Sequence, residues 1–285
     1  MKRLWTTFRY TYAGLRGQIL AWGLGLAIYG LLIVPMYDSL FAKQDTFQKM
    51  LASYPPEFLA FFGADTTSML TPGGFLGMYA FSMMPVIIGI FAVMAGSSLI
   101  IGDEERGRLD LILAHPVGRT SFFFGRTLGI LGATMSIMVL GWAGFSILLG
   151  GSSLGFNLAQ MAVPFLPLLV QILLYVTLAL MLSLLLPSRN LAAMIAGAVM
   201  VASYFISSMA FMDERVQAVS NLMPYHYFQT VLSFDELNLT WLLALLGISA
   251  VMTVFAWLRF LRRDIRLTGE GSWRMAFLFR RRNRV

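Results

Sequence analysis

The order of apolar and polar residues divides the chain into six long hydrophobic segments joined by shorter polar stretches. A helix needs roughly 20 mostly apolar residues to cross a hydrocarbon core about 30 Å thick. We therefore expect an all-α integral membrane protein with six transmembrane helices, built on a transmembrane domain at residues 17–260. The six segments contain no Asp, Glu, Lys or Arg and lie at about 17–37, 79–101, 127–149, 160–186, 191–211 and 239–257.

The two ends of the chain have a different composition. Residues 1–16 alternate apolar and basic side chains at helical spacing, which predicts an amphipathic helix in the headgroup region. A signal peptide is the alternative, but the following apolar run is too long and no small-residue cleavage site follows it. Residues 261–285 are basic and aromatic, and we interpret them as a cytoplasmic tail that anchors at the headgroups.

The charge of the connecting segments predicts the topology. Eighteen of the 21 Lys and Arg residues lie in the amino-terminal arm, in 102–126, in 187–190 and in the carboxy-terminal part from Arg259 onward, all on one face of a six-span chain. The other face has eight carboxylates and three bases. The positive-inside rule assigns the basic face to the cytoplasm, so we expect a multi-pass protein of the plasma membrane with both termini cytoplasmic. The net charge of +7 then reflects contact with membrane lipid, and nucleic-acid binding is the less economical interpretation.

Several kinds of chemistry are missing from the sequence. The only lysines are Lys2, Lys43 and Lys49, and none follows a glycine, so the chain has no phosphate-binding loop of its own. Because the spans lack ionisable groups, a proton-coupled carrier is disfavoured. No catalytic constellation is found, and cysteine is absent. We expect a transport subunit that has no ATPase site, no catalytic residue, no metal and no cofactor.

The densest charged stretch is 102–119, between the second and third apolar segments. Asp103 is suited to cap a helix, and the two following glutamates suit the positive end of its dipole. Leu109 and Leu113 are spaced to share one face, and Pro116 ends the predicted helix. The pattern predicts a short amphipathic helix at the membrane surface, and an ordinary solvated loop fits the pattern equally well.

This stretch resembles the cytoplasmic segment between spans two and three of ABC-2 type transporter permeases. The likeness covers Glu104-Glu105-Arg106-Gly107-Arg108-Leu109-Asp110-Leu111-Ile112-Leu113 and Pro116-Val117-Gly118-Arg119, and it departs from the family pattern at Arg108 and Gly118. The resemblance implies a coupling helix that docks on a cytoplasmic ABC ATPase subunit, which binds ATP and Mg. It also implies a prokaryotic exporter with a second permease copy or paralogue. The docking residues implied are Glu104, Glu105, Gly107, Arg108, Leu109, Leu111, Leu113, Pro116 and Arg119.

The composition of individual spans adds further expectations. Pro85 predicts a kink in span two, and Gly125 and Gly129 predict close helix packing in span three. Gln171 is expected to bond to a neighbouring helix. The aromatic cluster after Pro224 resembles the family's short helices that dip into the outer leaflet, and the resemblance implies that spans two and five flank the translocation route. Possible route residues are Met84, Met94, Ser203, Tyr204 and Ser207.

The uncharged spans suggest a lipophilic or amphiphilic substrate for this permease. A secondary carrier or channel is the first alternative, and transport driven by an ion gradient without an ATPase would favour it. A non-transporting scaffold subunit is the second alternative, and it would assemble with partners but show no flux.

Overall fold

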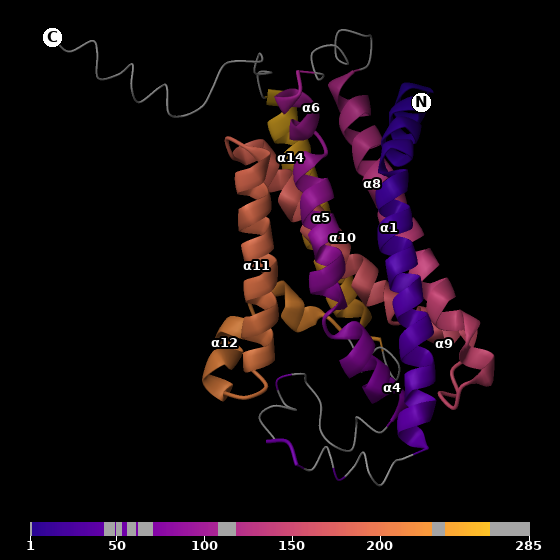
Figure 1. Cartoon of the computed structure of the whole chain (residues 1–285). Coiled ribbons are helices and arrows are strands. Elements are labelled where there is room, and N and C mark those ends of the chain that lie inside the picture. The colour runs from indigo at the N-terminus through magenta and orange to yellow at the C-terminus, as the bar shows by residue number, and fades with distance from the viewer. Residues whose placement is uncertain are drawn as a thin grey trace, which may run out of the picture.

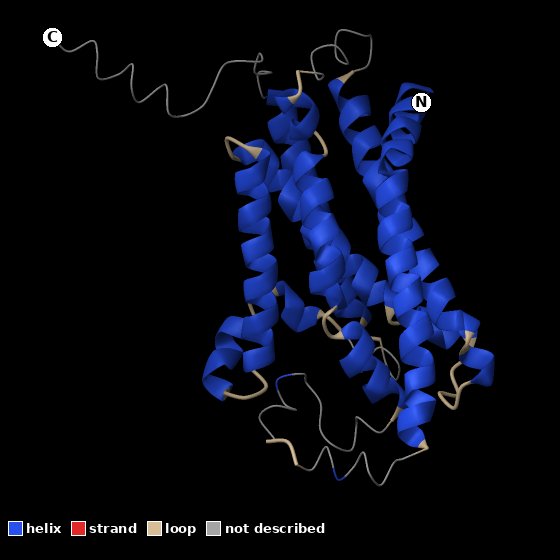
Figure 2. Ribbon diagram, viewed as in Figure 1, coloured by secondary structure: helices blue, strands red, loops and turns tan. Residues whose placement is uncertain are grey.

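The computed structural model describes residues 2–42, 49, 53–55, 61, 71–107, 118–229 and 237–262. All the regular secondary structure in these ranges is helical, and six helical segments are long and apolar enough to span a membrane (Figures 1 and 2). This confirms the predicted all-α fold with six spans. The helices are α1 (Lys2–Phe41), α4 (Pro72–Phe75), η2 (Leu76–Phe81), α5 (Met84–Ser98), α6 (Ile101–Glu105), α8 (Arg119–Ile147), η3 (Leu149–Gly151), α9 (Leu158–Ala162), α10 (Phe165–Leu185), α11 (Arg189–Met209), η4 (Glu214–Val216), α12 (Gln217–Ser220), η5 (Pro224–Tyr227) and α14 (Leu239–Arg262).

The structure first differs from the expectation in α1. The predicted surface helix at 1–16 and the predicted first span at 17–37 form one uninterrupted helix, and its amino-terminal part packs along α8. A Cβ atom at Gly125 would lie 2.6 Å from Thr7 Cβ, and one at Gly129 would lie 2.6 Å from Thr11 Cβ. Only glycine permits such an approach, so the predicted close-packing role of these two glycines is confirmed.

The same contact continues toward the other end of the two helices. Gly141 of α8 faces the Leu26 side chain of α1, and Gly144 lies directly against the backbone of Ala27. The two helices therefore touch along most of their length, as the adjacent ribbons of Figure 1 show.

Span two is broken into three pieces. Thr71 caps α4 by accepting a hydrogen bond from the Gly74 amide at 3.0 Å, and the chain then passes through the π-helix η2 before α5 begins. Ser82 and Met83 separate η2 from α5, and Pro85 lies in the first turn of α5, where its missing N–H costs no helical bond. The break therefore falls where Pro85 predicted a kink. The span starts at Pro72, earlier than the expected 79, so residues 72–78 belong to the span and not to the connecting segment before it.

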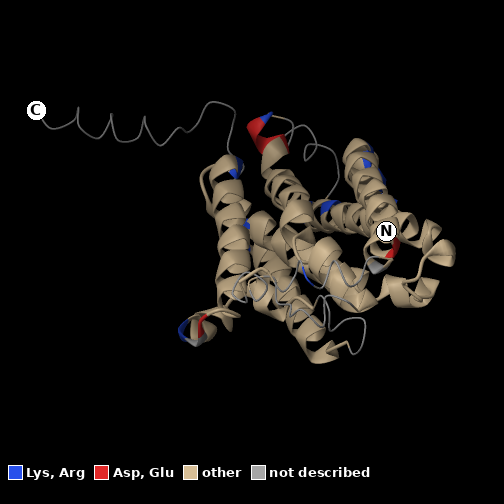
Figure 3. Ribbon diagram, turned by 60° about the horizontal axis from the view of Figure 1, so that its bottom comes forward, with Lys and Arg blue, Asp and Glu red and all other residues tan. Residues whose placement is uncertain are grey.

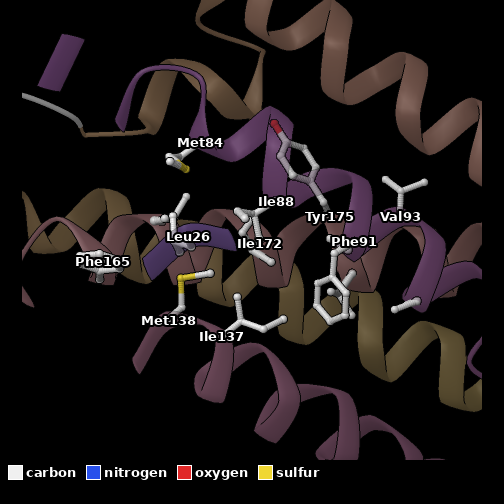
Figure 4. Close-up of a cluster of buried hydrophobic side chains, with 14 of the residues drawn as sticks. Leu26, Met84, Ile88, Phe91, Val93, Ile137, Met138, Phe165, Ile172 and Tyr175 are labelled. Carbon is white, nitrogen blue, oxygen red and sulfur yellow. The ribbon is translucent and has the colours of Figure 1, made fainter. Parts of the chain in front are cut away.

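The core lies where α1, α5, α8 and α10 meet. Figure 4 shows Leu26, Ile88, Ile137 and Ile172, one from each helix, converging on the same space. Each of these side chains is at most 3% exposed. Around this core, α11 packs on α5 and α10, and α14 packs on α10.

The two ends of the bundle differ in charge. The first residues of α1, helix α6, the start of α11 and the last residues of α14 lie at one end (Figure 1). The short helices α4, α9 and α12 lie at the other end. Most of the described basic residues belong to the first end. Figure 3 shows Lys and Arg in blue and the acidic residues of α6 in red. This is the end that the positive-inside rule predicts to be cytoplasmic.

Candidate functional site

The candidate site is the end of the bundle that carries α6, because the charged stretch 102–119 starts there. Helix α6 begins at Ile101 and not at Asp103, so Asp103 does not cap it, contrary to expectation. Gly107 ends this helical turn with a positive φ of 65°, a conformation that favours glycine, and its amide donates to the Glu104 carbonyl at 3.0 Å. Glu104 is buried, with 9% of its surface exposed.

Asp103 forms an ion pair with Arg126 of α8, and about a tenth of each side chain is exposed. The Arg126 guanidinium carbon also lies 5.2 Å from the ring centroid of Phe122 and 5.5 Å from that of Tyr10. A buried guanidinium needs a counter-ion and aromatic faces to offset the loss of water. Arg126 therefore ties α6 and α1 to α8.

Glu105 contacts the turn between spans four and five. Its Oε2 atom lies 3.0 Å from Arg189 Nε, and its Oε1 atom accepts a hydrogen bond from the Arg189 backbone amide at 3.1 Å. Ser188 caps the same helix by accepting from the Leu191 amide at 3.3 Å. Glu105 thus joins α6 to the first residue of α11.

Arg119 makes the third link at this end. It starts α8, and its guanidinium Nη1 donates to the Leu261 carbonyl of α14 at 3.0 Å. The stretch 102–119 is consequently attached to α8 and α11 near its beginning and to α14 near its end. The remaining predicted docking residues, Arg108, Leu109, Leu111, Leu113 and Pro116, lie outside the described residues.

At the opposite end, η5 inserts an aromatic side chain between span two and span five. Tyr225 is 8% exposed; its hydroxyl donates to the Ser82 carbonyl at the break in span two. Its amide donates to Ser203 Oγ of α11 at 2.8 Å, and its ring lies 5.1 Å from that of Tyr204. Short helices were predicted here, but the burial of Tyr225 was not.

Two residues of η5, which lies outside the spans, have shifted pKa values. Burial raises the pKa of the Tyr225 hydroxyl well above its usual value and lowers the pKa of His226 below 6.5. His226 is partly buried: its Nδ1 atom lies 3.2 Å from Ser220 Oγ, and its ring packs against Tyr227 and Trp241.

The predicted route residues separate into two groups. Ser203, Tyr204 and Ser207 are all at most 5% exposed and lie together on the inner face of α11. Met84 is buried in the core with Ile88, whereas 63% of Met94 is exposed on the outer face of α5. Met94 shares that face with Met83, Ile87 and Ile90.

Gln171 corrects another expectation. Its Nε2 atom donates to the Tyr175 hydroxyl at 2.9 Å, one turn further along the same helix, instead of bonding to a neighbouring helix. Its Oε1 atom is buried and has no hydrogen-bond partner among the described residues, and the same holds for Ser207 Oγ.

The sequence did not identify Arg126 and Arg189 as the residues that form ion pairs with the α6 carboxylates. Arg126 immediately precedes the predicted third span and Arg189 lies in a tight turn, so both were counted only as topological charges. A lone arginine that begins an apolar run is a weak signal for a buried pair. Nothing in the spacing identifies its partner, because 23 residues separate Arg126 from Asp103.

Six apolar helical spans, with a charged segment at one end of the bundle, define a multi-pass membrane protein. The family model described as "ABC-2 family transporter protein" matches residues 24–265, and the chain belongs to this family. It is thus a multi-pass membrane protein and the permease of an ABC transporter, which works with an ABC ATPase subunit. No match was found among curated proteins.

Proposed function

We propose that this chain is the permease subunit of an ATP-driven exporter in a prokaryotic plasma membrane. Two permease copies, or two similar permeases, would work with cytoplasmic ATPase subunits that bind ATP and Mg. The observation that carries the proposal is the attachment of the 102–119 stretch to α8, α11 and α14 through three separate contacts. A segment held in this way transfers a push from outside the membrane to several spans together.

The charge distribution supports a cytoplasmic position for this segment and for both termini. Arg3, Arg106, Arg189 and Arg262 all belong to the α6 end, and Asp38 belongs to the other end. Because the chain has no cysteine, single cysteines at Arg3 and at Arg215 can report the side of each end. A membrane-impermeant maleimide added to intact cells should label the cysteine at 215 and leave the one at 3 unlabelled.

The exposed face of α5 supports a lipophilic or amphiphilic substrate. Met83, Ile87, Ile90 and Met94 are spaced by four, three and four residues, which places them on one helical face, and each is more than 40% exposed. Flexible thioethers suit apolar ligands of variable shape. In the proposed assembly this face and the hydroxyl-bearing α11 flank the route, and membrane lipid covers the remaining apolar surface.

The docking role is tested with the leucines that the sequence places on one face of the segment. Tagged protein is purified in mild detergent from its own cells, and vanadate-sensitive ATP hydrolysis is measured in the eluate. The double variant Leu109→Ala/Leu113→Ala should reach the membrane in normal amount but lose most of the co-eluting hydrolysis. A matched control is Leu239→Ala/Leu243→Ala, which removes two exposed leucines from α14. A wild-type eluate without ATP hydrolysis would contradict the proposal.

A further inference from the structure

Glu105 contacts both the side chain of Arg189 and the backbone at the amino-terminal end of α11. One carboxylate oxygen pairs with the guanidinium at 3.0 Å, and the other accepts from the Arg189 backbone amide at 3.1 Å. That amide is among the first N–H groups of α11, which have no acceptor within their own helix. The helix dipole favours a negative charge at the same place. Glu105 is therefore a cap supplied to α11 by another element.

The two ion pairs of α6 differ in their exposure to water. About a tenth of each side chain is exposed in the Asp103–Arg126 pair, whereas the Glu105 and Arg189 side chains are 38% and 36% exposed. Water screens the second pair more strongly, so it opens at lower cost. Helix α6 is thus held to α8 by a largely buried pair and to α11 by a more exposed pair.

The packing of α11 near Arg189 makes this more exposed contact important. The inward side chains there are Ala192 and Ala196, both fully buried, while Met194 is 70% exposed. Small side chains let helices approach closely without interlocking. The position of this end of α11 therefore depends on its polar contact with Glu105 more than on side-chain interdigitation.

We infer that the Glu105–Arg189 pair transmits movement of the 102–119 stretch to α11. The inference rests on the proposed function and assigns Glu105 to a contact within the chain instead of to the ATPase surface. Both residues act as positioning residues: they touch neither nucleotide nor substrate, and they set the position of the helix that carries Ser203 and Ser207. Span five then moves with the coupling segment, together with spans two and three.

The test measures movement at the far end of α11. Met212, 48% exposed just beyond that end, is replaced by cysteine in the otherwise cysteine-free chain. The complex with its ATPase is reconstituted in liposomes, and the rate of labelling by a membrane-impermeant maleimide is measured without nucleotide and with Mg-ATP plus vanadate. The wild-type background should show a several-fold change in rate when nucleotide is added.

Variants of the pair should remove this response without releasing the ATPase. Arg189→Gln should lose more than half of the nucleotide-dependent change, while the amount of bound ATPase stays normal. The exchange Glu105→Arg/Arg189→Glu should restore part of the response, because the ion pair returns but the bond to the backbone amide does not. Arg9→Gln, which removes an exposed base from α1 at the same end, should respond like the wild type.

The outcomes separate this inference from the proposed function. If the wild-type chain binds no ATPase, the proposed function fails. If the wild type responds to nucleotide and Arg189→Gln responds equally, the inference is wrong. Loss of the ATPase from Arg189→Gln would also overturn it, because the pair would then serve docking. Glu105→Gln, which keeps an oxygen acceptor but removes the charge, provides the same readout should Arg189→Gln fail to fold, and an unchanged response there overturns the inference equally.

Discussion

Arg126 of α8 pairs with Asp103 of α6 inside the bundle, with the guanidinium carbon 5.2 Å from the ring centroid of Phe122. The pair lies beside the first turns of a helix whose following residues are almost all apolar. Each charge is stable there because the other is present, so the contact fixes the position of α6 before any partner binds.

Replacing Arg126 with alanine should destabilise the protein strongly. The change leaves Asp103 buried and unpaired, and removing one member of a buried pair costs about 3 kcal/mol or more. Thermal unfolding in detergent, followed by tryptophan fluorescence, measures the loss. The double variant Asp103→Asn/Arg126→Gln should recover most of it, because neither residue then carries a charge. Equal stability of Arg126→Ala and wild type would show that the pair contributes little.

Tyr225→Phe should weaken the junction between η5 and the break in span two. The variant keeps the ring but leaves the buried Ser82 carbonyl without the tyrosine donor, a loss of about 1–3 kcal/mol. Tyr227→Phe is the matched control, since its hydroxyl donates to the Asn221 carbonyl at an exposed position. Thermal unfolding of both variants should show a clear loss only for Tyr225→Phe. A similar loss in the two variants would argue against a special role for Tyr225.

Gly144→Val should disrupt the contact between α1 and α8. A side chain at this position would meet the Ala27 backbone, and an overpacked site of this kind costs about 1–3 kcal/mol. Gly25→Val on α1 is the control, because a Cβ there has no heavy atom within 4 Å. The midpoint of thermal unfolding should fall for Gly144→Val and change little for Gly25→Val. If both variants unfold alike, the effect would come from valine in a helix and not from the contact.

Acid should destabilise the segment around His226. Its pKa is lowered by burial, so the folded protein binds a proton less readily than the unfolded chain, whose value is about 6.5. The unfolded state then gains protons first as the pH falls through this range, and stability decreases with acidification. The unfolding midpoint of His226→Gln should therefore fall less between pH 7.5 and 5.5 than that of the wild type. Identical pH profiles would exclude His226 as the source.

The spans could be predicted from the sequence because each one satisfies a simple physical requirement. A lipid core demands long apolar helices, and Gly125 and Gly129 reveal a close contact because only glycine removes the Cβ atom. The same reasoning fails for the continuity of α1. The bases among residues 1–16 predicted an interfacial helix separate from the first span, whereas this part continues into the span without a break and packs on α8.

The links within the candidate site were beyond prediction for a different reason. Asp103 and Glu105 are two residues apart, and their partners come from α8 and α11, so the choice of partner depends on tertiary packing. Tyr225 and Ser82 are separated by 143 positions and meet only because span two is broken at that point. Local spacing holds no information about either contact.

The glycine contacts between α1 and α8 limit how the bundle can open. Gly125 and Gly129 lie against the short side chains of Thr7 and Thr11, and Gly144 lies against the Ala27 backbone, so few long side chains between the helices can re-pack as the helices shift. We expect these two helices to behave as a single stiff strut that tilts as one piece. Any movement that opens the bundle then has to come from the other helices, among them α5 and α11.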